Sequence, residues 1–252
     1  MNQNINSYWE KYNSIYSFEE VLREYRDKKV LEFLNIKNPS KILEIGCGYN
    51  PLFLKYKKFS SYFIIEPGVK PYENACKHSL DRKNVKCINN FLENCIDELS
   101  NETFDYIICS GVLHETHTPD SFLKGIGKLM QKRTSVYINV PNANSIHRLI
   151  AMEMGIIDNI FEKSDRNKYL SQKEIFDKSK LENIIIKNIP FAKIDECESF
   201  FLKPFTHDQM MNSLSKGCIN QNIIEGLYKT SKYFPDNGSE LYCIFSKNFI
   251  DT

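Results

Sequence analysis

The sequence lacks the features that most directly place a chain in a membrane, on nucleic acid or in an oxidising compartment. No run approaches the ~18 to 20 apolar residues that a membrane-spanning helix needs, and residues 1–14 carry no apolar signal-peptide region. The net charge is only +1, which disfavours a general polyanion-binding surface. The eight cysteines include no C-x-x-C pair, so we expect reduced core thiols and neither a disulfide framework nor a zinc site. These absences predict a cytoplasmic protein that binds neither membrane nor nucleic acid.

A glycine-containing stretch at residues 41–51 is the most informative part of the chain. It reads KILEIGCGYNP. Its first half is an apolar run with one acid, Glu44, and predicts a short buried strand. Gly46 and Gly48 allow a tight turn and a close approach of a ligand to the backbone. Pro51 suits the first turn of a following helix, where a missing N–H costs nothing.

The spacing of these residues separates two kinds of nucleoside-binding turn. The G-x-G-x-x-G turn of dinucleotide-binding folds would place its third glycine at position 51, which is proline. Glu44, Gly46, Gly48 and Asn50 instead alternate along the chain, and this resembles the E/D-x-G-x-G-x-G motif of class I S-adenosylmethionine-dependent methyltransferases. Asn50 replaces the last glycine, and asparagine tolerates left-handed backbone better than most residues. Glu44 would repel a pyrophosphate but not a cationic sulfonium.

The resemblance implies S-adenosylmethionine as cofactor and S-adenosylhomocysteine as product. A strand predicted at residues 61–65 ends in Glu66, a carboxylate suited to accept both ribose hydroxyls. Family position implies that Asn90 meets the adenine amino group and Phe91 its ring; an equal alternative is a loop asparagine and a core phenylalanine. The implied cofactor-binding residues are Glu44, Gly46, Cys47, Gly48, Asn50, Glu66, Pro67, Asn90, Phe91, Ser110, Gly111 and Val112.

Short apolar segments alternate with helical patterns along the first 145 residues. They predict five strands, at residues 41–45, 61–65, 85–88, 104–109 and 135–140. This order predicts an α/β, doubly wound, Rossmann-like and mostly parallel sheet, with ligands outside the carboxyl ends of the strands. Two late strands complete a seven-stranded class I methyltransferase sheet as an antiparallel C-terminal edge.

We expect a single methyltransferase domain over residues 1–252. Its expected parts are an N-terminal helical lid at 1–35, a cofactor-binding core at 36–145, substrate-cap insertions at 146–234 and a final edge strand at 235–252.

Methyl transfer to a hydroxyl needs a base, and histidine suits this role near neutral pH. We expect His114 or His147 to be this base, with Glu115 and His117 as positioning groups; an equal alternative for His114 is packing against the cofactor. Residues 114–117 read HETH, a spacing that differs from H-E-x-x-H, and no separate carboxylate pair completes a ligand set. No metal is therefore predicted.

Several residues are candidates for contacts with the methyl acceptor. Tyr12 and Tyr16 are expected to close over the site or, alternatively, to pack in an outer aromatic cluster, and Asn142 lies in the loop after the fifth strand. Arg148 is expected to meet a phosphate or carboxylate of the acceptor. Lys203 and Arg166 could have the same role, but we expect both of them on a solvated basic face.

The run VPNANSIHRLIAMEMGIID and the distant FFLKPF resemble methyltransferases of surface-polysaccharide and nucleotide-sugar pathways. This resemblance implies O-methylation of a small, phosphorylated sugar or nucleotide-linked acceptor. The alternatives are an N- or C-methyltransferase on another acceptor, and a non-catalytic cofactor-binding subunit that activates a partner. The sequence leaves a monomer and a homodimer open.

Overall fold

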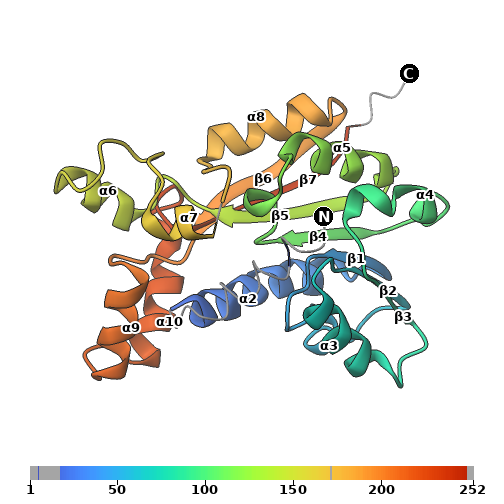
Figure 1. Cartoon of the computed structure of the whole chain (residues 1–252), viewed down its shortest axis with the longest axis horizontal. Coiled ribbons are helices and arrows are strands. Elements are labelled where there is room, and N and C mark those ends of the chain that lie inside the picture. The colour runs from blue at the N-terminus through green and yellow to red at the C-terminus, as the bar shows by residue number, and fades with distance from the viewer. Residues whose placement is uncertain (1–4, 6–17, 171, 249–252) are drawn as a thin grey trace.

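A seven-stranded sheet forms the centre of the computed structural model, which describes residues 5, 18–170 and 172–248 (Figure 1). The strand order is β3-β2-β1-β4-β5-β7-β6. The first five strands are parallel, and β7 is antiparallel to both of its neighbours. This confirms the predicted fold class. The strands are β1 (Lys41–Ile45), β2 (Ser61–Ile65), β3 (Val85–Ile88), β4 (Tyr106–Ser110), β5 (Ser135–Pro141), β6 (Ala192–Phe200) and β7 (Glu240–Lys247).

Helices cover both faces of the sheet and extend beyond one end of it (Figure 1). One face carries α2 (Glu19–Lys37), α3 (Val69–Ser79) and α10 (Gln221–Thr230). The other face carries α4 (Ile96–Leu99), α5 (Pro119–Leu129) and α8 (Lys178–Asn188). The remaining helices are α6 (Ile146–Glu153), α7 (Asp165–Tyr169) and α9 (His207–Ser215), with 3-10 turns at η1 (Leu52–Leu54), η2 (Leu92–Asn94), η3 (Leu113–Glu115) and η4 (Ser231–Tyr233).

The strands are apolar throughout because both faces of the sheet are buried. In β4, for example, Ile107 packs into the core under α5 while Ile108 packs into the core under α2. Within the helical lid expected at residues 1–35, the structure describes α2, whose buried side chains include Leu22, Tyr25 and Leu34.

The final strand does not form the edge that the sequence analysis expected. β7 lies between β5 and β6, and β6 is the edge strand. The six residues from Glu240 to Phe245 are all buried, as a strand with two neighbours and two covered faces requires. The first five residues of β6 alternate between half-buried and exposed, which is the pattern of an edge.

The cap expected over residues 146–234 is interrupted by parts of the core. α8 buries Leu181 and Ile185 against the sheet, and β6 pairs with β7 along its whole length. Helices α6, α7 and α9 lie beyond the sheet, on the left in Figure 1, with α10 beside α9.

The helix expected after the glycine-containing turn is replaced by the single 3-10 turn η1. Pro51 precedes this turn with an extended backbone, at φ −56° and ψ 134°. The backbone N–H of Leu52 is instead directed to the carboxylate of Glu44, 3.1 and 3.2 Å away.

All eight cysteines are free thiols, and five of them are buried. Within the described part of the chain, no helix combines the length and apolar character that a membrane span requires.

We predict that Gly238→Ala destabilises the protein by about 3 kcal/mol, since a side chain there would overpack the core. A Cβ at Gly238 would lie 2.4 to 2.6 Å from backbone atoms of Phe200, at the junction of β6 and β7. The matched control is Gly226→Ala in α10, where no atom lies within 4 Å of the added Cβ. The free energy of unfolding of this control is expected to rise by about 1 kcal/mol, because alanine has a higher helix propensity than glycine. Urea unfolding followed by circular dichroism measures both; equal effects would contradict the packing of β6 on this turn.

Candidate functional site

A cavity of about 2050 Å³ lies at the carboxyl ends of the parallel strands. Small-molecule sites usually measure ~300 to 1,000 Å³, so this cavity has room for a nucleoside cofactor and a sizeable acceptor together. The sequence-predicted residues that line it are Glu44, Gly46, Cys47, Gly48, Asn50, Glu66, Pro67, Phe91, Ser110, Gly111, Val112, His114, Glu115, His117, Asn142, His147 and Arg148. Tyr12 and Tyr16 lie outside the described residues.

The turn after β1 passes directly beneath the end of β4. Gly46 and Gly48 have positive φ values of 76° and 55°. A Cβ added to Gly46 would lie 2.5 Å from Cγ2 of Val112. Only glycine therefore combines this left-handed backbone with this close approach.

The carboxylate of Glu66 is placed beside this turn. Only 1% of Glu66 is exposed; Oε2 accepts from the Gly48 N–H at 2.9 Å, and Oε1 accepts from the Gly68 N–H at 2.8 Å. Each carboxylate oxygen keeps a second lone pair, which a ribose hydroxyl can use. Burial raises the pKa of Glu66 to about 7, against the lowering effect of these two hydrogen bonds.

Glu44 is also buried, and its contacts are within the protein. Its carboxylate accepts from the Leu52 N–H and, at 2.8 Å, from the hydroxyl of Tyr62. Burial raises its pKa to about 8. Glu44 therefore stabilises the turn, and most of the hydrogen-bonding capacity of its carboxylate is used within the protein.

The predicted adenine contacts divide into one residue at the cavity and one away from it. Phe91 lines the cavity. Asn90 is not among the lining residues, and its Oδ1 accepts from the Phe91 N–H and from Nδ2 of Asn94. Its neighbour Asn89 donates from Nδ2 to the Glu66 carbonyl at 2.8 Å, which fixes the segment after β3 against the end of β2.

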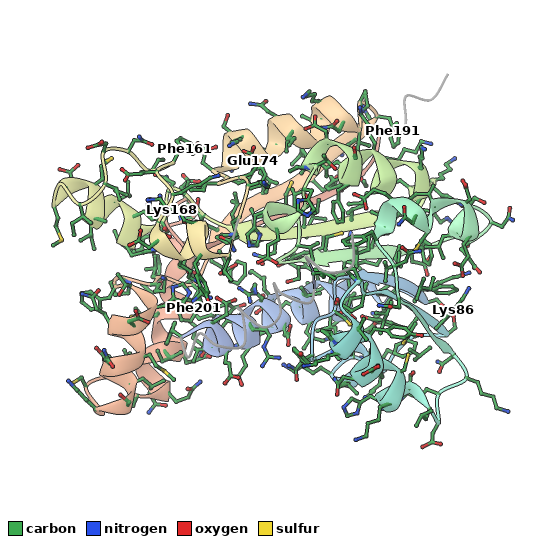
Figure 2. The ribbon with its side chains drawn as sticks, viewed as in Figure 1. Lys86, Phe161, Lys168, Glu174, Phe191 and Phe201 are labelled. Atoms are coloured by element: carbon green, nitrogen blue, oxygen red, sulfur yellow. The ribbon has the colours of Figure 1, made fainter. Side chains whose placement is uncertain are left out.

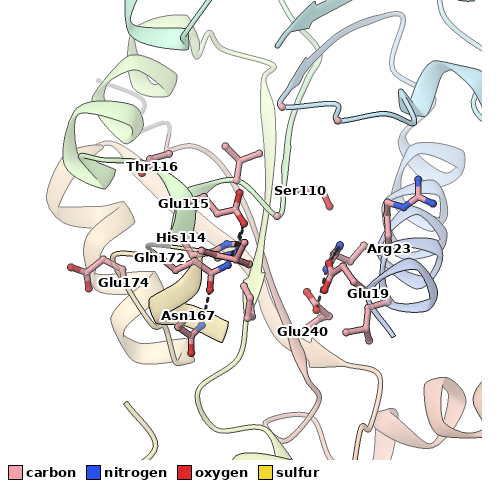
Figure 3. Close-up of a pocket in the computed structure, with 18 of the residues that line it drawn as sticks. Glu19, Arg23, Ser110, His114, Glu115, Thr116, Asn167, Gln172, Glu174 and Glu240 are labelled. Atoms are coloured by element: carbon pink, nitrogen blue, oxygen red, sulfur yellow. Dashed lines mark hydrogen bonds and ion pairs between the residues drawn. The ribbon is translucent and has the colours of Figure 1, made fainter. Parts of the chain in front are cut away.

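One wall of the cavity carries a histidine backed by a chain of polar residues (Figure 3). His114 is 6% exposed; its Nε2 lies 3.5 Å from Oε1 of Glu115, and its Nδ1 is buried with no hydrogen-bond partner among the described residues. Gln172 donates from Nε2 to the same Glu115 oxygen at 3.2 Å and accepts from Nδ2 of Asn167 in α7 at 2.6 Å. Gln172 and Asn167 were not predicted, because the sequence gives no sign that they face Glu115.

The second candidate base, His147, has a different environment. Burial lowers its pKa to about 2, and the positive charges of Lys203, His207 and Arg148 act in the same direction. His147 is therefore neutral and a poor proton acceptor near neutral pH.

Two predicted acceptor contacts are engaged inside the protein. Asn142 is 3% exposed and donates from Nδ2 to the carbonyls of Asp236 and Gly238. Arg148 donates to the carbonyls of Ile160 and Glu162 and thus ties α6 to the loop that follows it. Both residues line the cavity, but their donors serve the fold.

Charged residues that the sequence analysis missed line the opposite wall (Figure 3). Glu19 pairs with Arg26 and Arg166, and Arg26 also reaches Oε1 of Glu240 at 3.3 Å. Lys203, expected on a solvated face, is only 1% exposed, so this expectation was wrong. A signal was available for part of this wall, because Glu19, Arg23 and Arg26 share one face of a helix by their spacing.

The sequence matches a family model described as a methyltransferase domain over residues 17–179, which is more than half of the chain. It belongs to this methyltransferase-domain family. No curated protein matches the sequence.

Solved methyltransferase structures share the fold at low sequence identity. The N-methyltransferase NodS from Bradyrhizobium japonicum WM9 has a TM-score of 0.54 at 13% identity, with 92% of this chain and 99% of that chain covered. An S-adenosylmethionine-dependent methyltransferase from Archaeoglobus fulgidus has a TM-score of 0.55 at 12% identity, covering 89% and 94%. The plantazolicin methyltransferase BamL, solved with S-adenosylhomocysteine, has a TM-score of 0.54 at 15% identity, covering 98% and 97%. The chain thus belongs to a methyltransferase-domain family and shares its fold with solved S-adenosylmethionine-dependent methyltransferases.

The residues at the carboxyl ends of β1, β2 and β4 fit this cofactor. Gly46 and Gly48 line the cavity, and Glu66 offers lone pairs at the position expected for a ribose. Among the residues that the structure describes, no three His, Cys, Asp or Glu side chains come together as a metal site.

We predict that ribose recognition strengthens as the pH rises, because the two hydroxyls bind the ionised form of Glu66 best. With a pKa of about 7, the ionised fraction rises from about one tenth at about pH 6 to about nine tenths at about pH 8. The affinity for 5′-methylthioadenosine, whose own charge is constant in this range, should rise by about ninefold. Calorimetric titration of this ligand measures the profile. Glu66→Gln should flatten it, and a slope that survives this change would assign the titration to another group.

Proposed function

We propose that this methyltransferase methylates a hydroxyl of a small, phosphorylated sugar or nucleotide-linked acceptor, with His114 as the general base. The observation that carries the proposal is the state of the His114 ring. Its Nδ1 is buried in the cavity wall without a described partner, while its Nε2 faces Glu115.

The contacts around His114 leave one ring nitrogen for the acceptor. Since Nδ1 is buried, an acceptor hydroxyl would meet Nε2, whose lone pair would take up the proton beside the Glu115 carboxylate. The distance of 3.5 Å is long for a hydrogen bond, and such contacts often tighten when a ligand binds. Gln172 donates to the same oxygen of Glu115 and so limits the positions that this carboxylate can adopt.

S-adenosylmethionine, when bound, supplies a methyl group that its sulfonium has already activated. The protein's main task is then alignment, which for well-oriented reactants can contribute ~7 to 11 kcal/mol. Glu66 and the turn at Gly46 would fix the nucleoside, and His114 would remove the hydroxyl proton at Nε2. The developing imidazolium would be stabilised by the neighbouring carboxylate of Glu115.

We predict that the purified chain labels phosphorylated hydroxyl compounds from methyl-labelled S-adenosylmethionine. The panel pairs each sugar phosphate and nucleotide-linked sugar with its dephosphorylated form, and adds amines. The phosphorylated member should be preferred, and the label should resist mild alkali, as a methyl ether does and a methyl ester does not. Labelling of the amines alone would favour the alternative of an N-methyltransferase. Cofactor binding without any labelling would favour the non-catalytic subunit.

We predict that His114→Ala lowers kcat by about 100-fold or more, the usual contribution of a general base. Gln172→Ala should have a smaller effect, about tenfold, because it acts through Glu115. The matched control is His117→Ala, since His117 lines the same cavity but is exposed. Single-turnover kinetics and S-adenosylhomocysteine affinity are measured together. A full loss of cofactor affinity in His114→Ala would show that His114 packs against the cofactor and is not the base.

A further inference from the structure

A buried lysine in the cavity wall forms no ion pair with a described carboxylate. Lys203 follows β6, lines the cavity and is 1% exposed. Its contact is with the ring of His207, whose Nδ1 lies 3.1 Å from Nζ. An ammonium group has three N–H donors, and burial of an unpaired charge is unfavourable. Two of these donors thus remain for an anionic ligand.

The backbone before Lys203 is held in an uncommon conformation. Phe201 has a positive φ of 63°, and its ring is fully buried against Tyr25 and Phe18 of the α2 region, with centroid distances of 4.9 and 5.9 Å (Figure 2). Its carbonyl accepts from both the N–H and the hydroxyl of Ser239. A strained residue persists when its surroundings fix it, and such residues are concentrated at functional sites.

Further nitrogen groups surround the lysine, and they come from other elements. His147 lies in α6, and its Nδ1 is buried without a described partner. His207 is the first residue of α9, and its Nε2 lies 3.4 Å from Oε2 of Glu19. Burial lowers the pKa of Lys203 to about 8 and that of His207 to about 4.

Charged side chains of both signs act on Lys203. The carboxylates of Glu19 and Glu240 raise its pKa, while Arg166 and Arg148 lower it in the same direction as burial. Glu19 and Glu240 are the carboxylates that act on the pKa of Lys203, and both form ion pairs with Arg26.

We propose that Lys203 and His147 bind the phosphate group of the methyl acceptor, with His207 holding the Lys203 ammonium in place. The binding nitrogen groups come from α6 and from the segment after β6, and this arrangement suits a tetrahedral oxyanion better than a planar carboxylate. The phosphate would supply the charge that Lys203 lacks and occupy the part of the cavity that the cofactor leaves free. This inference rests on the proposed function, because it assigns the occupant of the acceptor half of the same cavity.

The test is a calorimetric titration of inorganic pyrophosphate into the protein saturated with S-adenosylhomocysteine, so that the cofactor half is filled. The wild-type protein should bind one pyrophosphate saturably. Lys203→Met should weaken this binding at least tenfold. The matched control is Lys173→Met, since Lys173 is an exposed lysine on the same cavity and should change the affinity less than twofold.

Lys203→Met is expected to keep its affinity for S-adenosylhomocysteine and its melting temperature, because it removes a buried charge and keeps the shape. Should this variant fail to fold, His147→Leu probes the same site without touching Lys203 and should weaken pyrophosphate binding about fivefold. Two outcomes would overturn the phosphate site but leave the proposed function standing. In the first, the wild-type protein binds the cofactor but no pyrophosphate. In the second, the wild type and the folded variant bind pyrophosphate with equal affinity. Malonate binding at least as tight as that of pyrophosphate would overturn the choice of phosphate. Loss of cofactor binding in the wild type would instead overturn the proposed function itself.

Discussion

The cofactor half of the cavity depends on the turn after β1, which two buried carboxylates hold in place. Glu66 accepts from the Gly48 N–H, and Glu44 accepts from the Leu52 N–H on the far side of the turn. With both sides held, Gly46 can lie against Val112 at a distance that no side chain would permit. The ends of β1, β2 and β4 are therefore fixed relative to one another before any ligand arrives, which is the preorganisation that alignment catalysis needs.

The two halves of the cavity differ in charge. The cofactor half contains the carboxyl groups of Glu44 and Glu66, whose pKa values burial raises to about 8 and about 7. The other half contains Lys203 and Arg148. Both carboxyl groups of the cofactor half are fully ionised only above about pH 8, so their attraction for a cationic methyl donor increases with pH. Lys203 offers a positive charge to an anionic acceptor in the other half.

The sequence predicts what depends on local pattern and misses what depends on contacts between distant segments. The strands and the glycine turn were predictable because apolar runs and positive-φ positions are visible in short windows. The continuous apolar run in β7 and the alternation in β6 would also have revealed which strand is the edge. The burial of Lys203 was not predictable, because it follows from packing of Phe201 against α2, nearly two hundred residues earlier. The position of Gln172 beside Glu115 has the same kind of origin.

The place of β7 in the sheet has a consequence for how the protein is made. β7 is the last of the strands that the structure describes, yet it fills the gap between β5 and β6, and its first residue, Glu240, belongs to the cavity wall. During synthesis β5 and β6 emerge with an open space between them, and each has an unpaired edge until residues 240–247 leave the ribosome. Exposed strand edges invite association with other chains. The completed sheet and the completed cavity thus appear in the same late step, so a nascent chain acquires its chemistry only when its most vulnerable surface has been closed.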